Sequence, residues 1–128
     1  MLGLEEDRQK HKKVHGGPDR AVCVYSLEVI LALQAEGHPI YPGSAGENVT
    51  VSGLDWTAVI PGSRFELGTT VVLEVTRYTE PCKLIAESFT AKAFRRIDQV
   101  RNPGWSRVYT RVIREGVVRI GEPVRLAQ

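Results

Sequence analysis

The stretch NVTVSGLDWTAVIPGSRFELGTTVVLEVTR, from Asn48 to Arg77, decides the fold class of this chain. It holds short runs rich in β-branched residues, which are separated by Gly53, by Pro61-Gly62 and by Gly68. Such runs favour strands, and glycine and proline favour the turns between them. The predicted strands are Asn48 to Ser52, Ala58 to Ile60, Ser63 to Leu67 and Thr70 to Arg77. This spacing predicts a meander or a small β-barrel.

The chain before this stretch predicts one more strand and a helix. Ala21 to Tyr25 reads AVCVY, a short apolar run that is typical of a buried strand. Ser26 then has the side chain of a helix N-cap, and apolar residues recur at helical spacing up to Gly37. The polar residues before Ala21 predict a loop, with a helical turn around Glu5 to Lys12.

The chain after Cys82 changes pattern twice. Between Lys83 and Val100 the strand pattern is lost, and Phe94 and Ile97 lie among charged residues as in an amphipathic surface helix. From Gly104 onward it returns, with predicted strands at 108–112, 117–120 and 124–126. Together these patterns predict a mainly β fold, a small barrel with one or two short helices.

Length and composition are those of one globular domain, expected over residues 1–128. Hydrophobic residues make up 42% and charged residues 25% of the 128 residues. The formal net charge of +2 and the lack of a recognisable motif argue against nucleic-acid binding. No apolar run approaches the length of a membrane span. Cys23 and Cys82 form no CxxC pair, which is typical of a reducing compartment, so we expect a cytoplasmic protein without membrane contacts.

Cys82 is the residue of greatest chemical interest. It follows Pro81 near the end of the longest β-branched run, with Arg77 and Lys83 nearby in the sequence. A thiol among cations ionises more readily, and a thiolate is a nucleophile, a persulfide carrier and a soft metal ligand. Cys23 has apolar neighbours on both sides and is expected in the core. A structural role is the alternative for Cys82, because free cysteines are often buried.

A second candidate site is the segment His15-Gly16-Gly17-Pro18-Asp19-Arg20, which precedes the first buried strand. Paired glycines let successive backbone N–H groups face an anion, and His15, Asp19 and Arg20 would stand at the strand entrance. The alternative is a glycine turn with a solvated charge pair. His11 and His15 have the HxxxH spacing of a metal site, but the glycines end any helix there. With no third ligand nearby, no zinc is expected.

Glu47 and Asn48 form a third candidate, at the end of a glycine-rich loop that begins at Pro42. The carboxylate accepts hydrogen bonds, and the amide both donates and accepts them. The pair therefore suits the edge of a heterocycle. It equally suits the hydrogen bonds of its own turn, and the local pattern alone favours the turn.

The fourth candidate is the face of a predicted strand that carries Arg107, Tyr109 and Arg111. Guanidinium groups bind phosphate, and a tyrosine ring stacks on a planar cofactor. The alternative is a solvated face with cross-strand pairs to Glu115 or Glu122.

Taken in order, these segments resemble the MOSC domain family, which is related to the C-terminal part of molybdenum cofactor sulfurase. The series is GLEEDR from Gly3, HGGPDRAV from His15, PGSAGEN from Pro42, Pro81-Cys82, and RVIREGVVRIG from Arg111. The resemblance covers nearly the whole chain. Its most specific pieces are His15 to Val22, Gly43 to Asn48 and Pro81-Cys82.

The resemblance implies a barrel-like β fold around a pocket that accepts the pterin of the molybdenum cofactor. It also implies that Cys82 handles sulfur or contacts molybdenum. Family members occur fused to a pyridoxal-phosphate-dependent desulfurase, in reductases of N-hydroxylated compounds, and as stand-alone small bacterial proteins, and this chain resembles the last group. Members usually have a strand before the Gly-Leu segment, so we expect a barrel that lacks its first strand or is completed by another subunit in a homo-oligomer.

Three functions are consistent with these residues. The first is a domain that binds molybdopterin, or sulfur from a desulfurase partner, through the Cys82 thiolate. The second is a small molybdenum-dependent reductase of N-hydroxylated compounds that works with an electron-transfer protein, and the third is a non-catalytic barrel that binds anions or a protein. In the first, the supporting residues are Arg20, Arg77, Lys83, Arg107 and Arg111 for charge, Glu47, Asn48 and Tyr109 for the ring, and His15 and Asp19 for protons.

Overall fold

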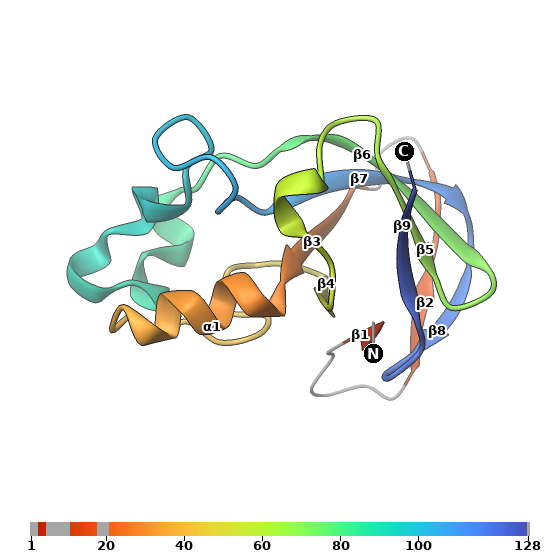
Figure 1. Cartoon of the computed structure of the whole chain (residues 1–128), viewed down its shortest axis with the longest axis horizontal. Helices are drawn as coiled ribbons and strands as arrows, with labels where there is room; N and C mark the ends of the chain where they lie inside the picture. The colour runs from red at the N-terminus through yellow and green to blue at the C-terminus, as the bar shows by residue number, and fades with distance from the viewer. Residues whose placement is uncertain (1–2, 5–10, 18–20, 128) are drawn as a thin grey trace.

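The computed structural model describes residues 3–4, 11–17 and 21–127. Within them, seven strands form one curled sheet, in the order β1-β4-β3-β7-β6-β5-β9, and β2 and β8 form a separate two-stranded ribbon (Figure 1). The strands are β1 (Gly3–Leu4), β2 (His11–Val14), β3 (Val22–Ser26), β4 (Val49–Ser52), β5 (Arg64–Leu67), β6 (Val71–Tyr78), β7 (Val108–Arg114), β8 (Gly116–Arg119) and β9 (Val124–Ala127). The helices are α1 (Leu27–Ala35) and the short 3-10 helices η1 (Trp56–Ala58), η2 (Lys83–Ser88), η3 (Thr90–Lys92) and η4 (Phe94–Ile97).

The predicted mainly β, barrel-like fold is confirmed. Figure 1 shows the curled sheet and the β2-β8 ribbon at one end of the molecule, and α1 with the η2–η4 segment at the other. Among the described residues, no helix is long and apolar enough to cross a membrane.

Strand β3 lies inside the sheet, between β4 and β7, and joins distant parts of the chain. It pairs with β7 in antiparallel fashion, with Val22 opposite Thr110, and with β4 in parallel, with Val24 opposite Val49. Parallel neighbours need a crossover connection, and α1 with the loop after it supplies this connection. The sheet is therefore mixed, and a simple meander describes only part of it.

Helix α1 begins as the sequence predicts. Ser26 is the N-cap, and its Oγ accepts a hydrogen bond from the Val29 backbone N–H at 3.2 Å. Val29, Ile30 and Leu33 are buried against the sheet, and Gly37 takes a φ of +100° just beyond the helix end. Glycine reaches such a φ without the steric cost of a side chain.

The predicted strand at Ala58 to Ile60 is wrong. Residues 56–58 form η1, which is capped by the Asp55 side chain accepting from the Thr57 backbone N–H at 3.1 Å. Trp56 is 7% exposed, and its Nε1–H donates to the Ser106 carbonyl at 2.8 Å. A capped turn that buries a large ring thus overrides the local strand preference.

Two other helical predictions also differ from the structure. The amphipathic helix expected around Phe94 and Ile97 is only η4, one 3-10 turn, in which Ile97 alone is buried. The loop and helical turn expected before Ala21 are wrong at His11–Val14, which form β2 opposite β8. The rest of the predicted turn lies outside the described residues.

Asn48 ties the glycine-rich loop to β3. Its Oδ1 accepts from the Cys23 backbone N–H, and its own N–H donates to the Cys23 carbonyl, both at 2.8 Å. The side chain therefore continues the parallel β3–β4 ladder by one residue. This contact fits the turn interpretation of Asn48 rather than contact with a heterocycle.

We predict that Asn48→Ala lowers the free energy of unfolding by about 1–3 kcal/mol, because the Cys23 N–H loses its acceptor in a largely buried position. Asn48→Asp keeps an acceptor oxygen and should lose less. Urea unfolding followed by circular dichroism measures both. Equal losses in the two variants would contradict the proposed role of Oδ1.

Candidate functional site

Cys82 lies just beyond β6, where the chain leaves the sheet. The segment 79–82 leads from the end of β6 to η2, and Cys82 occupies the cap position of η2. Its carbonyl accepts from the Ile85 N–H at 3.1 Å, whereas its thiol makes no capping bond and is exposed. The backbone of Cys82 is thus fixed while its sulfur is accessible.

The thiol opens into a hollow of about 540 Å³, which we call the basic hollow. It is lined by Pro81, Cys82, Lys83, Ala86, Glu87, Lys92, Phe94 and Arg95. The lining holds three cationic side chains and one carboxylate, Glu87, so its net charge is positive. The volume falls in the range of small-molecule sites, roughly 300–1,000 Å³.

The backbone at the rim of the basic hollow is strained. Ala91 and Lys92 have φ values of +55° and +57° without being glycines. Such conformations are uncommon for residues with a side chain and concentrate at ligand-binding segments. A neighbouring hollow of about 470 Å³ shares Lys92, Phe94 and Arg95 with the basic hollow.

Arg96 and Arg101, which line the neighbouring hollow, are already engaged. Arg96 donates two hydrogen bonds to the Glu36 carboxylate, at 2.9 and 2.7 Å, and lies 4.0 Å from the centre of the Trp105 ring. Arg101 pairs with Asp98 at 3.7 Å. The pKa of Glu36 is lowered, chiefly by its hydrogen bond to Arg96. The cations of the basic hollow have no such carboxylate partner among the described ion pairs.

Arg107, which bonds the backbone two residues before Cys82, is 6% exposed. Its Nη1 donates to the Ala45 carbonyl at 2.7 Å, and its Nη2 donates to the Glu80 carbonyl at 3.4 Å. One guanidinium group thus joins the glycine-rich loop to the segment that carries Cys82. Arg107 does not line the basic hollow, and it positions backbone rather than facing solvent.

Glu47 is also buried and holds its own loop. Its Oε2 accepts from the Gly43 N–H and from the Thr50 hydroxyl, each at 3.0 Å. Its other oxygen, Oε1, is buried without a hydrogen-bond partner in the described part of the chain. Like Asn48, Glu47 is therefore placed where its contacts shape the loop.

Arg77, Tyr109 and Arg111 lie on an open part of the sheet and not in the basic hollow. The Arg77 guanidinium is 4.5 Å from the centre of the Tyr109 ring, and Arg111 pairs with Glu74 at 2.6 Å. The cross-strand partner of Arg111 is thus Glu74, and not Glu115 or Glu122, which the sequence suggested. Arg111 lowers the pKa of Glu74 through a hydrogen bond.

His15 is exposed and far from Cys82. His15 directly follows β2. The backbone N–H of the next residue, Gly16, donates to the Glu115 carboxylate beside the β2-β8 ribbon. This ribbon abuts Thr70, just before β6, whereas Cys82 follows the other end of that eight-residue strand. The length of β6, about 25 Å, separates the two. Asp19 and Arg20 lie outside the described residues.

Of the predicted site residues, the structure brings together Cys82 and Lys83. Lys92 and Arg95, which the site prediction did not include, complete the charge of the hollow. Their charges are visible in the sequence, but nothing in the local pattern shows that η3 and η4 turn back toward η2. No cluster of three metal-binding side chains occurs within the described ranges.

Cys23 differs from Cys82 in its surroundings. It is 4% exposed within β3, and burial raises the pKa of its thiol to about 11. The nearby Arg107 lowers this pKa and Glu47 raises it, but desolvation dominates. Cys23 is therefore protonated at neutral pH, and Cys82 is the accessible thiol.

The fold and the site define a small barrel-like β domain with an exposed cysteine in a basic hollow. The chain belongs to the MOSC domain family, because a sequence model of the MOSC domain matches residues 11–125. This confirms the family that the sequence resembles.

Individual relatives agree with this assignment. The uncharacterized protein YflK of Bacillus subtilis (strain 168) is 36% identical over 124 residues, which is 96% of this chain and 55% of YflK. The crystal structure of YiiM from Geobacillus stearothermophilus has a TM-score of 0.68 and 30% identity, covering 92% of this chain and 60% of that one. A protein named reductase from Gibberella moniliformis (strain M3125 / FGSC 7600) is 30% identical over 89% of this chain and 21% of its own length. The chain thus spans about half of YflK and a smaller share of the reductase.

Cys23 makes stability depend on pH. Between its ordinary pKa of 9.0 and its folded pKa of about 11, the folded protein keeps a proton that the unfolded chain has lost. The stability that the protonated Cys23 thiol contributes is complete below pH 9.0 and is lost as the pH rises toward 11. The free energy of unfolding therefore falls over this range. Two pKa units correspond to about 3 kcal/mol.

We therefore predict a smaller loss of stability in Cys23→Ala than in the wild type between about pH 8.5 and 10.5. Urea unfolding in reducing buffer at both pH values measures the difference. The pKa of Tyr25 is also raised by burial, but this contribution is common to both proteins. Parallel pH profiles would show that Cys23 does not titrate as described.

Proposed function

We propose that this domain binds the molybdenum cofactor in the basic hollow, with the Cys82 thiolate contacting the metal or carrying sulfur for it. The MOSC family is associated with this cofactor. The observation that carries the proposal is an accessible thiol among Lys83, Lys92 and Arg95.

The residues of the hollow fit the chemistry of the cofactor. A thiolate is a soft ligand suited to a transition metal or to a persulfide sulfur. Lys83, Lys92 and Arg95 offer donors and positive charge to phosphate or to oxo groups. The Phe94 ring lies in the same lining and adds apolar surface to it, with the Arg95 guanidinium 5.3 Å from the centre of the ring.

The chain and the cofactor would divide the work. When bound, the cofactor supplies the redox chemistry, and the protein binds and orients it. Cys82 would hold its position because Arg107 fixes Glu80 and the Ile85 N–H fixes the Cys82 carbonyl. A desulfurase that carries a persulfide would supply the sulfur: the Cys82 thiolate would attack the outer sulfur, the S–S bond of the donor would break, and the donor would leave as a thiolate.

A reductase activity is the second candidate, and the relative named reductase favours it. Electrons for such a reaction would come from a separate transfer protein. Assaying the molybdenum-loaded chain with a chemical reductant and an N-hydroxylated base distinguishes the two functions: turnover favours the reductase, and stable loading without turnover favours the carrier.

We predict that Cys82→Ser loses most of the molybdenum that the wild type retains after isolation from a cofactor-producing host. Serine keeps the size of the side chain but not its soft thiolate. Metal analysis by mass spectrometry measures retention, and Cys23→Ser is the matched control because that thiol is buried. Retention by the Cys82→Ser variant equal to the wild type would reject the ligand role.

A second prediction concerns charge. Lys92→Gln with Arg95→Gln should weaken binding of the isolated cofactor about tenfold and reduce its salt dependence. Arg111→Gln with Arg125→Gln removes the same charge from residues outside the hollow and should change little. Titration at two salt concentrations checks both variants. Similar losses in both would mean that net charge, not the hollow, attracts the cofactor.

A further inference from the structure

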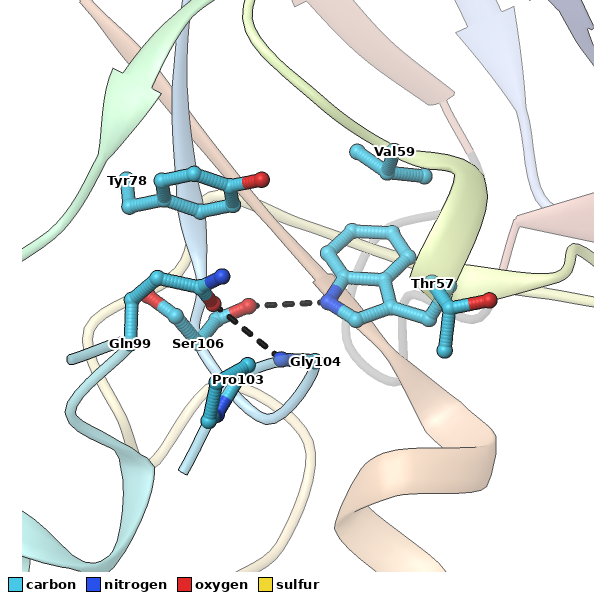
Figure 2. A pocket seen from close by; sticks show the side chains of 8 residues that line it. Thr57, Val59, Tyr78, Gln99, Pro103, Gly104 and Ser106 are labelled. Atoms are coloured by element: carbon cyan, nitrogen blue, oxygen red, sulfur yellow. Dashed lines mark hydrogen bonds between the residues drawn. The ribbon is translucent and has the colours of Figure 1, made fainter. Parts of the chain in front are cut away.

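A second cavity, different in character from the basic hollow, lies between η1 and the start of β7. It measures about 180 Å³ and is lined by Trp56, Thr57, Val59, Tyr78, Gln99, Pro103, Gly104 and Ser106 (Figure 2). None of these lining side chains is charged. We call it the neutral cavity.

One wall of the neutral cavity is a fixed aromatic ring. The Trp56 Nε1–H is committed to the Ser106 carbonyl at 2.8 Å. The same ring stacks on Phe65, with centroids 6.1 Å apart, and meets Tyr25 edge to face at 6.3 Å. Its orientation is therefore set before any ligand enters, and the part of the ring that lines the cavity forms an apolar wall.

The Gln99 amide is one of the polar groups of the cavity, beside the hydroxyl-bearing residues Thr57, Tyr78 and Ser106. Its Oε1 accepts from the Gly104 N–H at 3.2 Å, which orients the amide. Figure 2 shows the amide nitrogen directed toward the space between the Tyr78 and Trp56 rings. This nitrogen donates no hydrogen bond to the described residues, so the cavity offers an N–H donor.

We infer that the neutral cavity binds an uncharged molecule with one planar aromatic or heteroaromatic ring and a carbonyl-type acceptor. Apolar protein cavities of roughly 150 Å³ take up benzene. A volume of about 180 Å³ thus accommodates one ring with a small substituent. The Gln99 amide selects an acceptor, and the absence of a cation from the lining disfavours an anion.

This cavity is near Cys82 along the chain. Tyr78 lines it, and four residues later Cys82 lines the basic hollow. Even a fully extended segment of this length spans about 14 Å at most. A ring in the neutral cavity and a cofactor at Cys82 would therefore occupy neighbouring sites. Binding of the ring itself does not depend on the proposed role of Cys82.

The test uses benzamide as the probe and benzoate, its anion of similar shape, as the comparison. In a Trp105→Phe background, Trp56 is the single remaining tryptophan, since the chain has two. Benzamide should give a saturable change in Trp56 fluorescence in the millimolar range expected for so small a ligand. Benzoate should bind at least about tenfold more weakly.

Matched variants locate the binding. Gln99→Glu keeps an oxygen for the Gly104 N–H but replaces the donor with a carboxylate, so benzamide should bind at least about tenfold more weakly. Tyr78→Phe keeps the ring and should bind normally. Cys82→Ser should also bind normally, which separates this inference from the proposed function.

Calorimetry on the unsubstituted chain provides the same comparison of benzamide and benzoate without any variant. Equal affinity for the two probes, no saturable binding of benzamide, or full binding by a folded Gln99→Glu variant would each overturn the inference. Stronger binding of benzamide together with its loss in Gln99→Glu supports it.

Discussion

The buried guanidinium of Arg107 is the interaction on which the arrangement of the site depends. Burying a charge is costly unless hydrogen bonds replace its water, and here two backbone carbonyls accept from Nη1 and Nη2, whereas Nε is buried without a partner among the described residues. Those carbonyls belong to Ala45 and Glu80, in two loops that are distant in the sequence. Arg107 thereby fixes the backbone on which Cys82 is mounted while the thiol stays outside, in contact with solvent. The sequence left Arg107 either in contact with phosphate or on a solvated strand face, and in the structure its guanidinium is buried and donates to two backbone carbonyls.

The parts of the fold that were predictable are those governed by local rules. The β-branched runs of β4 and β6 and the Ser26 cap of α1 depend on neighbours within a few residues. The failures occurred where distant contacts decide. Trp56 forms a turn because its ring packs on Phe65 and binds Ser106, and no window around residues 58–60 contains that information.

The same limit applies to the site. Cys82 can be picked out from its own neighbours in the sequence. Lys92 and Arg95 join it only because the chain turns back through η3, where two residues that are not glycine have a left-handed backbone. Conversely, His15, Arg77 and Arg111 carry suitable chemistry but lie elsewhere, His15 beside the β2-β8 ribbon and the two arginines on the sheet. The result is two nearby sites of different character. The basic hollow is cationic and holds a thiol, and the neutral cavity is uncharged and has aromatic walls.

The position of β3 between β4 and β7 also affects how the protein folds during synthesis. Its antiparallel neighbour β7 begins at Val108, so Val22 meets Thr110 only after most of the chain has been synthesised. Until then one edge of β3 has no partner strand, and its backbone N–H and C=O groups on that edge are free to pair with other chains. Sheets that depend on such distant pairings close slowly. On the ribosome, this domain is therefore completed late, and its nascent N-terminal part is the state in which protection by chaperones matters most.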